Sequence, residues 1–198
     1  MLAVCVLSAQ TEDKEAALGK VLASDMDGRT RAVHDTRIEE YVQHLGDRIA
    51  AQMPAARYPF TFHVIADDTC PATHEPVALP GGYIFVPIAL FKAAKDEAEF
   101  AGMLALAMEH VALRHGEPPT GQGRIDNLGK IPLIYVGGGI GFCAGQALVP
   151  MSFRETARRN EEEAKAAATQ VLARIKFEER SGEFVAIQER VRALSTTQ

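Results

Sequence analysis

The sequence predicts an α+β fold that is mostly helical and contains a small mixed sheet. Apolar residues recur every three or four positions over much of the chain, which is the period of a helix with one buried face. Residues 58–66 instead alternate between apolar and polar side chains, as a strand does. With 198 residues, of which 47% are hydrophobic and 24% are charged, the chain has the length and composition of one globular domain.

Residues 11–53 show the helical period, and we expect two helices here. Their boundary is expected at Asp25, Asp27 and Gly28, because acidic residues and a glycine favour a turn. Residues 1–10 are apolar and end in small residues, which resembles the end of a secretory signal cleaved near Ala9, without its basic start. A partly ordered tail fits these residues equally well. We therefore expect a single domain at 11–198, preceded by a signal-peptide remnant or a tail.

The sheet is expected to contain residues 58–66 and two short extended segments within 77–86. The interruption between these segments is Pro80, Gly81 and Gly82, and the chain continues as an apolar strand from Tyr83 to Val86. Proline and glycine are typical of sheet edges, because proline cannot donate a hydrogen bond to a neighbouring strand. The pattern therefore predicts an edge strand after the glycines.

Three further helices are predicted in the second half of the chain. The first runs from Lys95 to about His115, with Asp96 and Glu97 near its positive end, and the others cover Arg154–Phe177 and Phe184–Leu194. Between them, Ile131–Met151 is apolar and rich in glycine, which predicts a buried hairpin or an interfacial segment in peripheral contact with a membrane. A membrane anchor is the alternative for this segment.

Charge and cysteine usage exclude two classes of function. The formal net charge is −5 at pH 7, and the basic residues form no stripe of the kind that binds phosphates, so nucleic acid is excluded as a partner. The three cysteines, Cys5, Cys70 and Cys143, form no CxxC pair and no cluster with histidine. Their spacing therefore indicates no structural zinc site, and it leaves a Cys70–Cys143 disulfide undecided.

Three segments of the chain resemble, in the same order, the signatures of one family. Residues 101–116, AGMLALAMEHVALRHG, are similar to the stretch AGxLGHEIGHVALRHG of the zinc metallopeptidases that include HtpX and the CAAX prenyl proteases, which are gluzincin HExxH peptidases. Residues 78–86, ALPGGYIFV, resemble the family's substrate-binding strand. The third match, to the pattern SRxxExxAD, consists of Ala157, Arg158, Glu161, Ala164 and Lys165. The resemblance implies a zincin-like fold, zinc, proteolysis and a place in the cell envelope.

The chain differs from this family at residues that peptide hydrolysis requires. In HExxH, two histidines four residues apart hold zinc, and the glutamate after the first activates the zinc-bound water. Leu106 and Ala107 stand at the first histidine and at the glutamate. Only His110 and Glu161 remain at family ligand positions, whereas a catalytic zinc needs three protein ligands and a water. The sequence therefore predicts a vestigial site that binds zinc weakly or not at all, with Glu109 as a poor substitute base.

The third segment also carries a positive charge where the family has a negative one, next to the expected metal position. Lys165 stands where the family has aspartate, and it follows Glu161 by four residues, the favourable order for an ion pair on a helix. We expect its ammonium group to replace part of the lost metal charge, with Arg158 as a second neighbour of the site. A solvated helix face that includes Glu161 and Lys165 is the alternative.

Two functions are compatible with these residues. The first is a non-catalytic, peptide-binding or chaperone-like protein, a pseudoenzyme of the cell envelope, periplasm or secreted space, whose partner is an extended peptide or unfolded segment. The resemblance assigns that contact to Gly81, Gly82, Tyr83, Ile84 and Phe85. The second is an active zinc metalloendopeptidase with an unorthodox ligand set of His110, Glu161 and His74, and with Glu109 as base. A cytoplasmic location is the alternative to the envelope.

Overall fold

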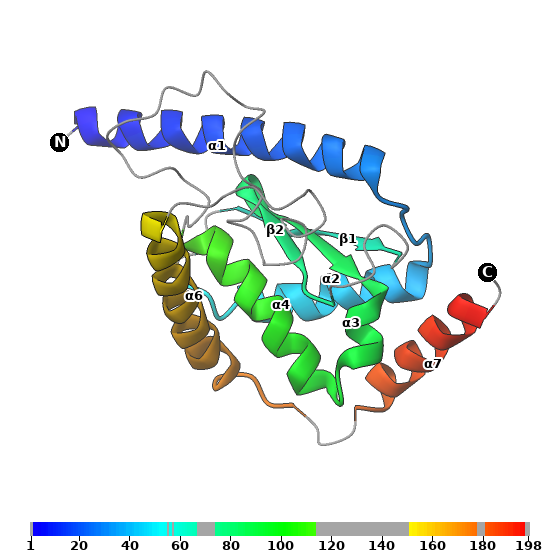
Figure 1. The fold of residues 1–198 in the computed structure, drawn as a ribbon. Helices are drawn as coiled ribbons and strands as arrows, with labels where there is room; N and C mark the ends of the chain where they lie inside the picture. The colour runs from blue at the N-terminus through cyan, green and yellow to red at the C-terminus, as the bar shows by residue number, and fades with distance from the viewer. Residues whose placement is uncertain are drawn as a thin grey trace.

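The structure is a computed structural model that describes residues 2–54, 56, 58–66, 74–113, 151–177 and 181–196. It is mostly helical and has one small mixed sheet, as the sequence predicts. Its elements are α1 (Leu2–Arg29), α2 (Thr36–Ala50), β1 (Thr61–Ile65), β2 (Val77–Leu79), the 3-10 turn η2 (Pro80–Gly82), β3 (Tyr83–Pro87), α3 (Ile88–Ala93), α4 (Glu97–Ala112), α6 (Met151–Leu172) and α7 (Gly182–Thr196) (Figure 1).

The three described strands are ordered β1–β3–β2, so β3 is the central strand and not an edge. It pairs in parallel with β1, where Phe62 lies opposite Ile84, and antiparallel with β2, where Ala78 lies opposite Ile84. The expectation of an edge strand after the glycines is therefore wrong. The proline and the glycines belong to the turn η2, and the strand that follows is apolar because it is covered on both faces.

The turn η2 depends on its two glycines and is covered by α1. Gly81 and Gly82 have φ angles of 76° and 93°, a region that L side chains rarely adopt. Helix α1 packs directly on this turn at Gly19, where any Cβ atom would overlap the Pro80 carbonyl group. The turn therefore lies beneath α1 (Figure 1), with Gly81 close to Ala16 of that helix and Gly82 close to Pro59.

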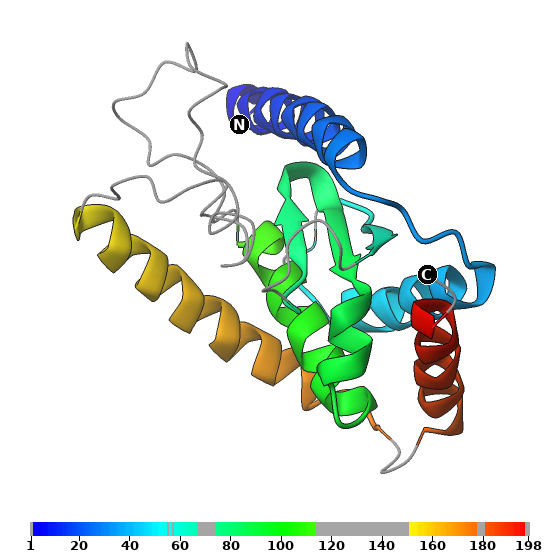
Figure 2. The same ribbon diagram turned by 45° about the vertical axis from the view of Figure 1, so that its right-hand side comes forward.

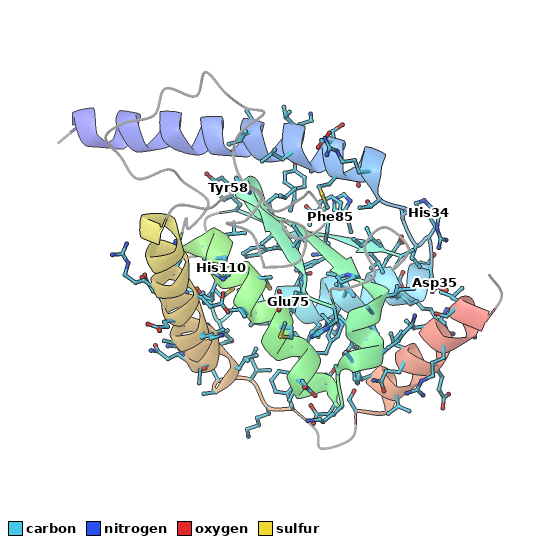
Figure 3. The ribbon with its side chains drawn as sticks, in the orientation of Figure 1. His34, Asp35, Tyr58, Glu75, Phe85 and His110 are labelled. Atoms are coloured by element: carbon cyan, nitrogen blue, oxygen red, sulfur yellow. The ribbon has the colours of Figure 1, made fainter. Side chains whose placement is uncertain are left out.

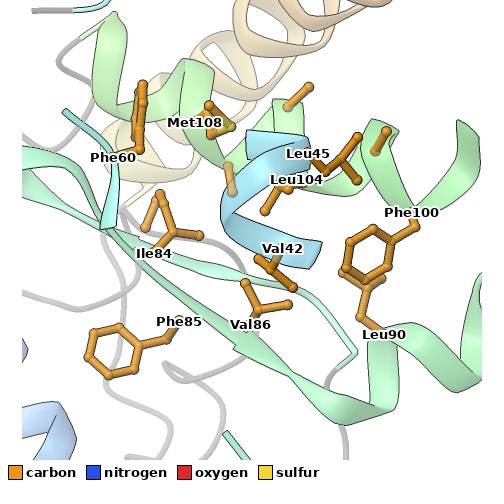
Figure 4. Packing of buried hydrophobic residues seen from close by; sticks show 14 of the residues in the cluster. Val42, Leu45, Phe60, Ile84, Phe85, Val86, Leu90, Phe100, Leu104 and Met108 are labelled. Atoms are coloured by element: carbon orange, nitrogen blue, oxygen red, sulfur yellow. The ribbon is translucent and has the colours of Figure 1, made fainter. Parts of the chain in front are cut away.

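The sheet lies between α1 on one face and α2 with α4 on the other (Figures 1 and 2). On the α1 side, His63 of β1 stacks on Phe85 and its Nδ1 lies 3.3 Å from Asp27 of α1. On the other side, Ile84 and Val86 face the buried side chains of α2 and α4 (Figure 4). This arrangement fixes α4 against the sheet, and α6 then packs on α4.

Several boundaries differ from those expected. Helix α1 begins at Leu2 and continues through Asp25, Asp27 and Gly28, because Asp25 pairs with Arg29 at 2.9 Å and the position of Gly28 is open. Helix α3 was not predicted, since it is too short for its period to stand out. Helix α4 begins at Glu97 with Asp96 as its N-cap, two residues after the expected start at Lys95, and it ends at Ala112. Helix α6 ends five residues before Phe177.

Some predictions concern residues outside the described part of the chain. These are the Cys70–Cys143 pair, the helical end at His115 and the apolar segment at 131–150. Among the helices that are described, none combines the length and the hydropathy that a membrane span requires.

Candidate functional site

One face of α4 forms the floor of a small pocket. Leu106 and Ala107 each lie three or four residues from both Met103 and His110, so the four side chains share one face of the helix. Glu75 and Pro76, which precede β2, form one side of the pocket, and Glu161 of α6 forms the other. The pocket has a volume of about 50 Å³. Figure 3 shows His110 on α4 beside α6, with Glu75 at the end of the sheet.

The packing of α6 on α4 brings Glu161 to this face. Buried Ala164, Ala168 and Val171 form the apolar side of α6. Gly102 of α4 faces Leu172, and a Cβ atom at that glycine would make an ordinary van der Waals contact of 3.9 Å with the Leu172 side chain. Small side chains allow two helices to pack closely. Residues 110 and 161, which are far apart in the sequence, therefore come into direct contact.

Glu161 bridges two basic side chains. Its Oε2 lies 3.1 Å from Nε2 of His110, and its Oε1 lies 3.0 Å from Nζ of Lys165. The His110 side chain is 11% exposed, that of Glu161 39% and that of Lys165 61%. The ion pair expected from the spacing of Glu161 and Lys165 is therefore present, and it lies at the mouth of the pocket.

The electrostatics favour a neutral histidine beside an ionised carboxylate. Burial lowers the pKa of His110, although the neighbouring Glu161 acts in the opposite direction. For Glu161, burial alone would raise the pKa, but the hydrogen bonds from Lys165 and His110 and the charge of Lys165 outweigh it, and the pKa lies below its usual value. A neutral His110 then donates its Nε2–H to Glu161.

The side chains at this site do not match a catalytic zinc centre. Such a centre needs three protein ligands and an open position for water. Within the described ranges, no three His, Cys, Asp or Glu side chains are grouped as a metal site would require. Leu106 and Ala107, which face the same pocket as His110, offer no donor atom. His110 and Glu161 therefore meet in space, but the two of them supply fewer donors than a catalytic zinc requires.

The other residues that were proposed as a base or a metal ligand do not line the pocket. Glu109 is 3% exposed, and it lies about 100° around the helix from His110. Burial raises the pKa of Glu109. His74 is exposed and does not line the pocket. Arg158 belongs to α6, but its side chain lies outside the description. Neither suggested substitute, Glu109 or His74, therefore reaches the cleft beside His110.

The residues assigned to substrate contact by resemblance also lie elsewhere. Gly81 and Gly82 form the turn under α1, and Tyr83, Ile84 and Phe85 belong to the central strand. The backbone of β3 pairs with β1 and β2, so it has no free edge for a peptide. Pro76 and Met103 line the pocket without having been predicted, and so does one ionisable residue, Glu75. It precedes β2, and it would have been found if β2 had been recognised as the edge strand.

Comparison with known proteins links the chain to proteases. It is 31% identical over 103 residues to the beta-barrel assembly-enhancing protease of Yersinia pestis, a match that covers 52% of this chain and 20% of that protein. It is 26% identical over 182 residues to the protein of the same name from Escherichia coli K12, covering 83% of this chain and 35% of the relative. No family model matches the chain. The chain thus has protease homologues at low identity and spans about a fifth to a third of their length.

Proposed function

We propose that the chain is a non-catalytic member of the metallopeptidase type with a zincin-like fold, and that it holds an extended peptide or an unfolded protein segment. Its role is chaperone-like and its place is the cell envelope. The observation that carries this proposal is the composition of the pocket wall. Leu106 and Ala107 line the pocket at the positions of the family's histidine and glutamate, while His110 and Glu161 contact each other. Low-identity protease homologues support the same origin.

The spacing of the two remaining polar residues supports descent from a metal site. Two ligands about 2.1 Å from a tetrahedral zinc lie roughly 3.4 Å apart. The Nε2 atom of His110 and the Oε2 atom of Glu161 are 3.1 Å apart. The two side chains are therefore hydrogen-bonded to each other, at a separation close to that of two ligands on one metal ion.

The peptide is proposed to bind along β2. This strand pairs with β3 and is an edge of the described sheet. Its residues are buried, at 1–3% exposed, so a peptide would bind through the backbone groups of this edge, with no metal involved. Glu75 and Pro76, just before β2, border the pocket on α4. A peptide at this edge would pass the pocket, whose apolar residues Met103, Leu106 and Ala107 suit one small apolar side chain.

Peptides methylated on single backbone nitrogens test this mode of binding. In strand addition, alternate N–H groups of the peptide pair with the protein, so methylation should abolish binding at every second position only. The measurement is fluorescence anisotropy with an extended, labelled peptide selected from a library against the purified protein. Equal sensitivity at all positions, or at none, would contradict strand addition.

A matched pair of tryptophan variants tests the pocket itself. Leu106→Trp should fill the pocket and weaken peptide binding at least tenfold. Val21→Trp adds the same ring to an exposed position of α1, where the valine is 61% exposed, and should leave binding unchanged. If both variants lost peptide affinity to a similar extent, the pocket would not be part of the peptide-binding site.

The alternative is an active zinc metalloendopeptidase. Loss of a general base typically costs on the order of a hundredfold or more in rate, and a family ligand is missing as well. We expect no casein hydrolysis above background and no stoichiometric zinc by elemental analysis. Stoichiometric zinc together with cleavage that a chelator abolishes would establish the alternative instead.

A further inference from the structure

We propose that the ammonium group of Lys165 takes the place of a metal ion at this site: it is the cation that holds Glu161 beside His110, and it competes with any metal for the Glu161 carboxylate. This inference takes one point from the proposed function, namely that the pocket descends from a metal site. It adds a specific residue that keeps the site free of metal.

The geometry of the carboxylate is the main observation. Glu161 uses one oxygen for His110, at 3.1 Å, and the other for Lys165, at 3.0 Å. Both oxygens therefore have partners: a metal held jointly by His110 and Glu161 would replace their mutual hydrogen bond, and it would share the carboxylate with the ammonium group of Lys165, whose positive charge repels it. The lysine lies one helical turn after the glutamate, so the backbone of α6 sets their distance.

The surroundings of the carboxylate explain why a cation is needed. The pocket contains a second carboxylate, Glu75, and its described lining residues include no lysine or arginine. A partly buried carboxylate such as Glu161, beside an apolar wall of Met103, Leu106 and Ala107, is costly unless a positive charge is near. In the metallopeptidases this charge is the metal ion. Here Lys165, at the mouth of the pocket, supplies it to Glu161.

The pair is not strong in itself. Lys165 is 61% exposed, and exposed ion pairs contribute little to folding because solvent screens them. The inference therefore predicts little change in the stability of the fold when Lys165 is replaced. It predicts a change in the affinity of the site for a metal, because the metal and the ammonium compete for the same oxygens.

The test restores the missing ligand and base and then removes the competitor. Leu106→His with Ala107→Glu gives the parent variant, and zinc affinity is measured by isothermal titration calorimetry after folding is checked by circular dichroism. Adding Lys165→Met should tighten zinc binding about fivefold or more. Adding Lys165→Arg, which keeps the charge, should leave the affinity of the parent unchanged.

A control separates the specific contact from the general charge of α6. Arg159 is exposed on the same helix, and no contact joins it to Glu161. Adding Arg159→Met to the parent variant removes one positive charge as Lys165→Met does, but it should change zinc affinity less than twofold. Equal effects of the two methionine substitutions would overturn the inference, and so would no effect of Lys165→Met.

A second measurement covers the case in which none of these variants binds zinc. In a crystal structure of the unaltered protein, Nζ of Lys165 should lie within hydrogen-bond distance of Glu161, also when crystals are soaked in zinc. A lysine turned to solvent, or zinc bound to Glu161 in the presence of Lys165, would refute the proposal. Neither result depends on peptide binding, so failure here is distinguishable from failure of the proposed function.

Discussion

Tyr41 illustrates how single buried residues connect distant elements. Its hydroxyl group donates a hydrogen bond of 3.0 Å to Glu97, the first residue of α4, and its ring packs against Phe100 and Phe184. Glu97 is 6% exposed, so its carboxylate depends on this partner. One phenol thus ties α2 to the beginning of the helix that carries His110.

The pH dependence of stability should reveal this contact. Burial first, and then the charge of Glu97, raises the pKa of Tyr41 far above its ordinary value of 10.0. A group with a raised pKa in the folded state stabilises the fold fully below its unfolded value and loses that contribution as pH rises. Tyr41→Phe should therefore cost about 1–3 kcal/mol at pH 7. The difference from the unaltered protein should shrink above pH 10, measured by urea denaturation, and a constant difference would contradict this.

At the scale of elements, α1 acts as a cover for the sheet. It packs on η2 and contacts β2 and β3, and its buried residues Ala23 and Met26 join the main core. The close approach requires a residue without a side chain at Gly19, which faces the Pro80 carbonyl. The helix is therefore part of the folded domain and also screens the glycine turn from solvent.

Two glycines of the same helix give a matched test of this docking. Gly19→Ala should lower the free energy of unfolding by at least about 1–3 kcal/mol, because the methyl group overlaps the backbone of η2. Gly28→Ala meets no atom within 4 Å and should raise it by up to about 1 kcal/mol, because alanine favours the helix. The measurement is chemical denaturation followed by circular dichroism. Stabilisation by both changes would show that α1 does not dock as described.

At the scale of the whole molecule, α7 holds together elements that lie far apart in the sequence. Arg190 donates from Nε to Asp35 at 2.7 Å, and Asp35 also caps α2 by accepting from Arg37 and Ile38. Gln188 of α7 donates to the carbonyl groups of Phe91 and Ala94, at 2.8 and 2.9 Å. The last helix thus connects the N-terminus of α2 with the end of α3, on the side away from α6 (Figure 2).

The aromatic contact of α7 offers a test of this role. Phe184 is 2% exposed and packs against Tyr41 and Phe100. Phe184→Ala should cost about 3–5 kcal/mol, and it should lower the melting temperature by roughly 10 °C. Val185, its exposed neighbour, is the control, and Val185→Ala should change stability by less than about 0.5 kcal/mol. Differential scanning calorimetry measures both. A small effect of Phe184→Ala would mean that α7 is not part of the cooperative unit.

The sequence by itself determined the local features of this protein. Helical and alternating periods identified most helices and the strands, and the spacing of Glu161 and Lys165 predicted their contact, because these depend on neighbouring residues. It also identified Leu106 and Ala107 as the departure from a peptidase motif. It missed α3, and it misplaced the boundary after α1, where local signals are weak.

The tertiary structure decided what depends on contacts distant in the sequence. It made β3 the central strand, because strand order follows from long-range hydrogen bonds with β1 and β2 that a local pattern does not contain. It brought Glu75 to the pocket and left Glu109 and His74 outside it. It also joined His110 to Glu161, through the packing of α6 on α4. Periodicity indicates which face of an element is buried, but only packing selects the element that covers it.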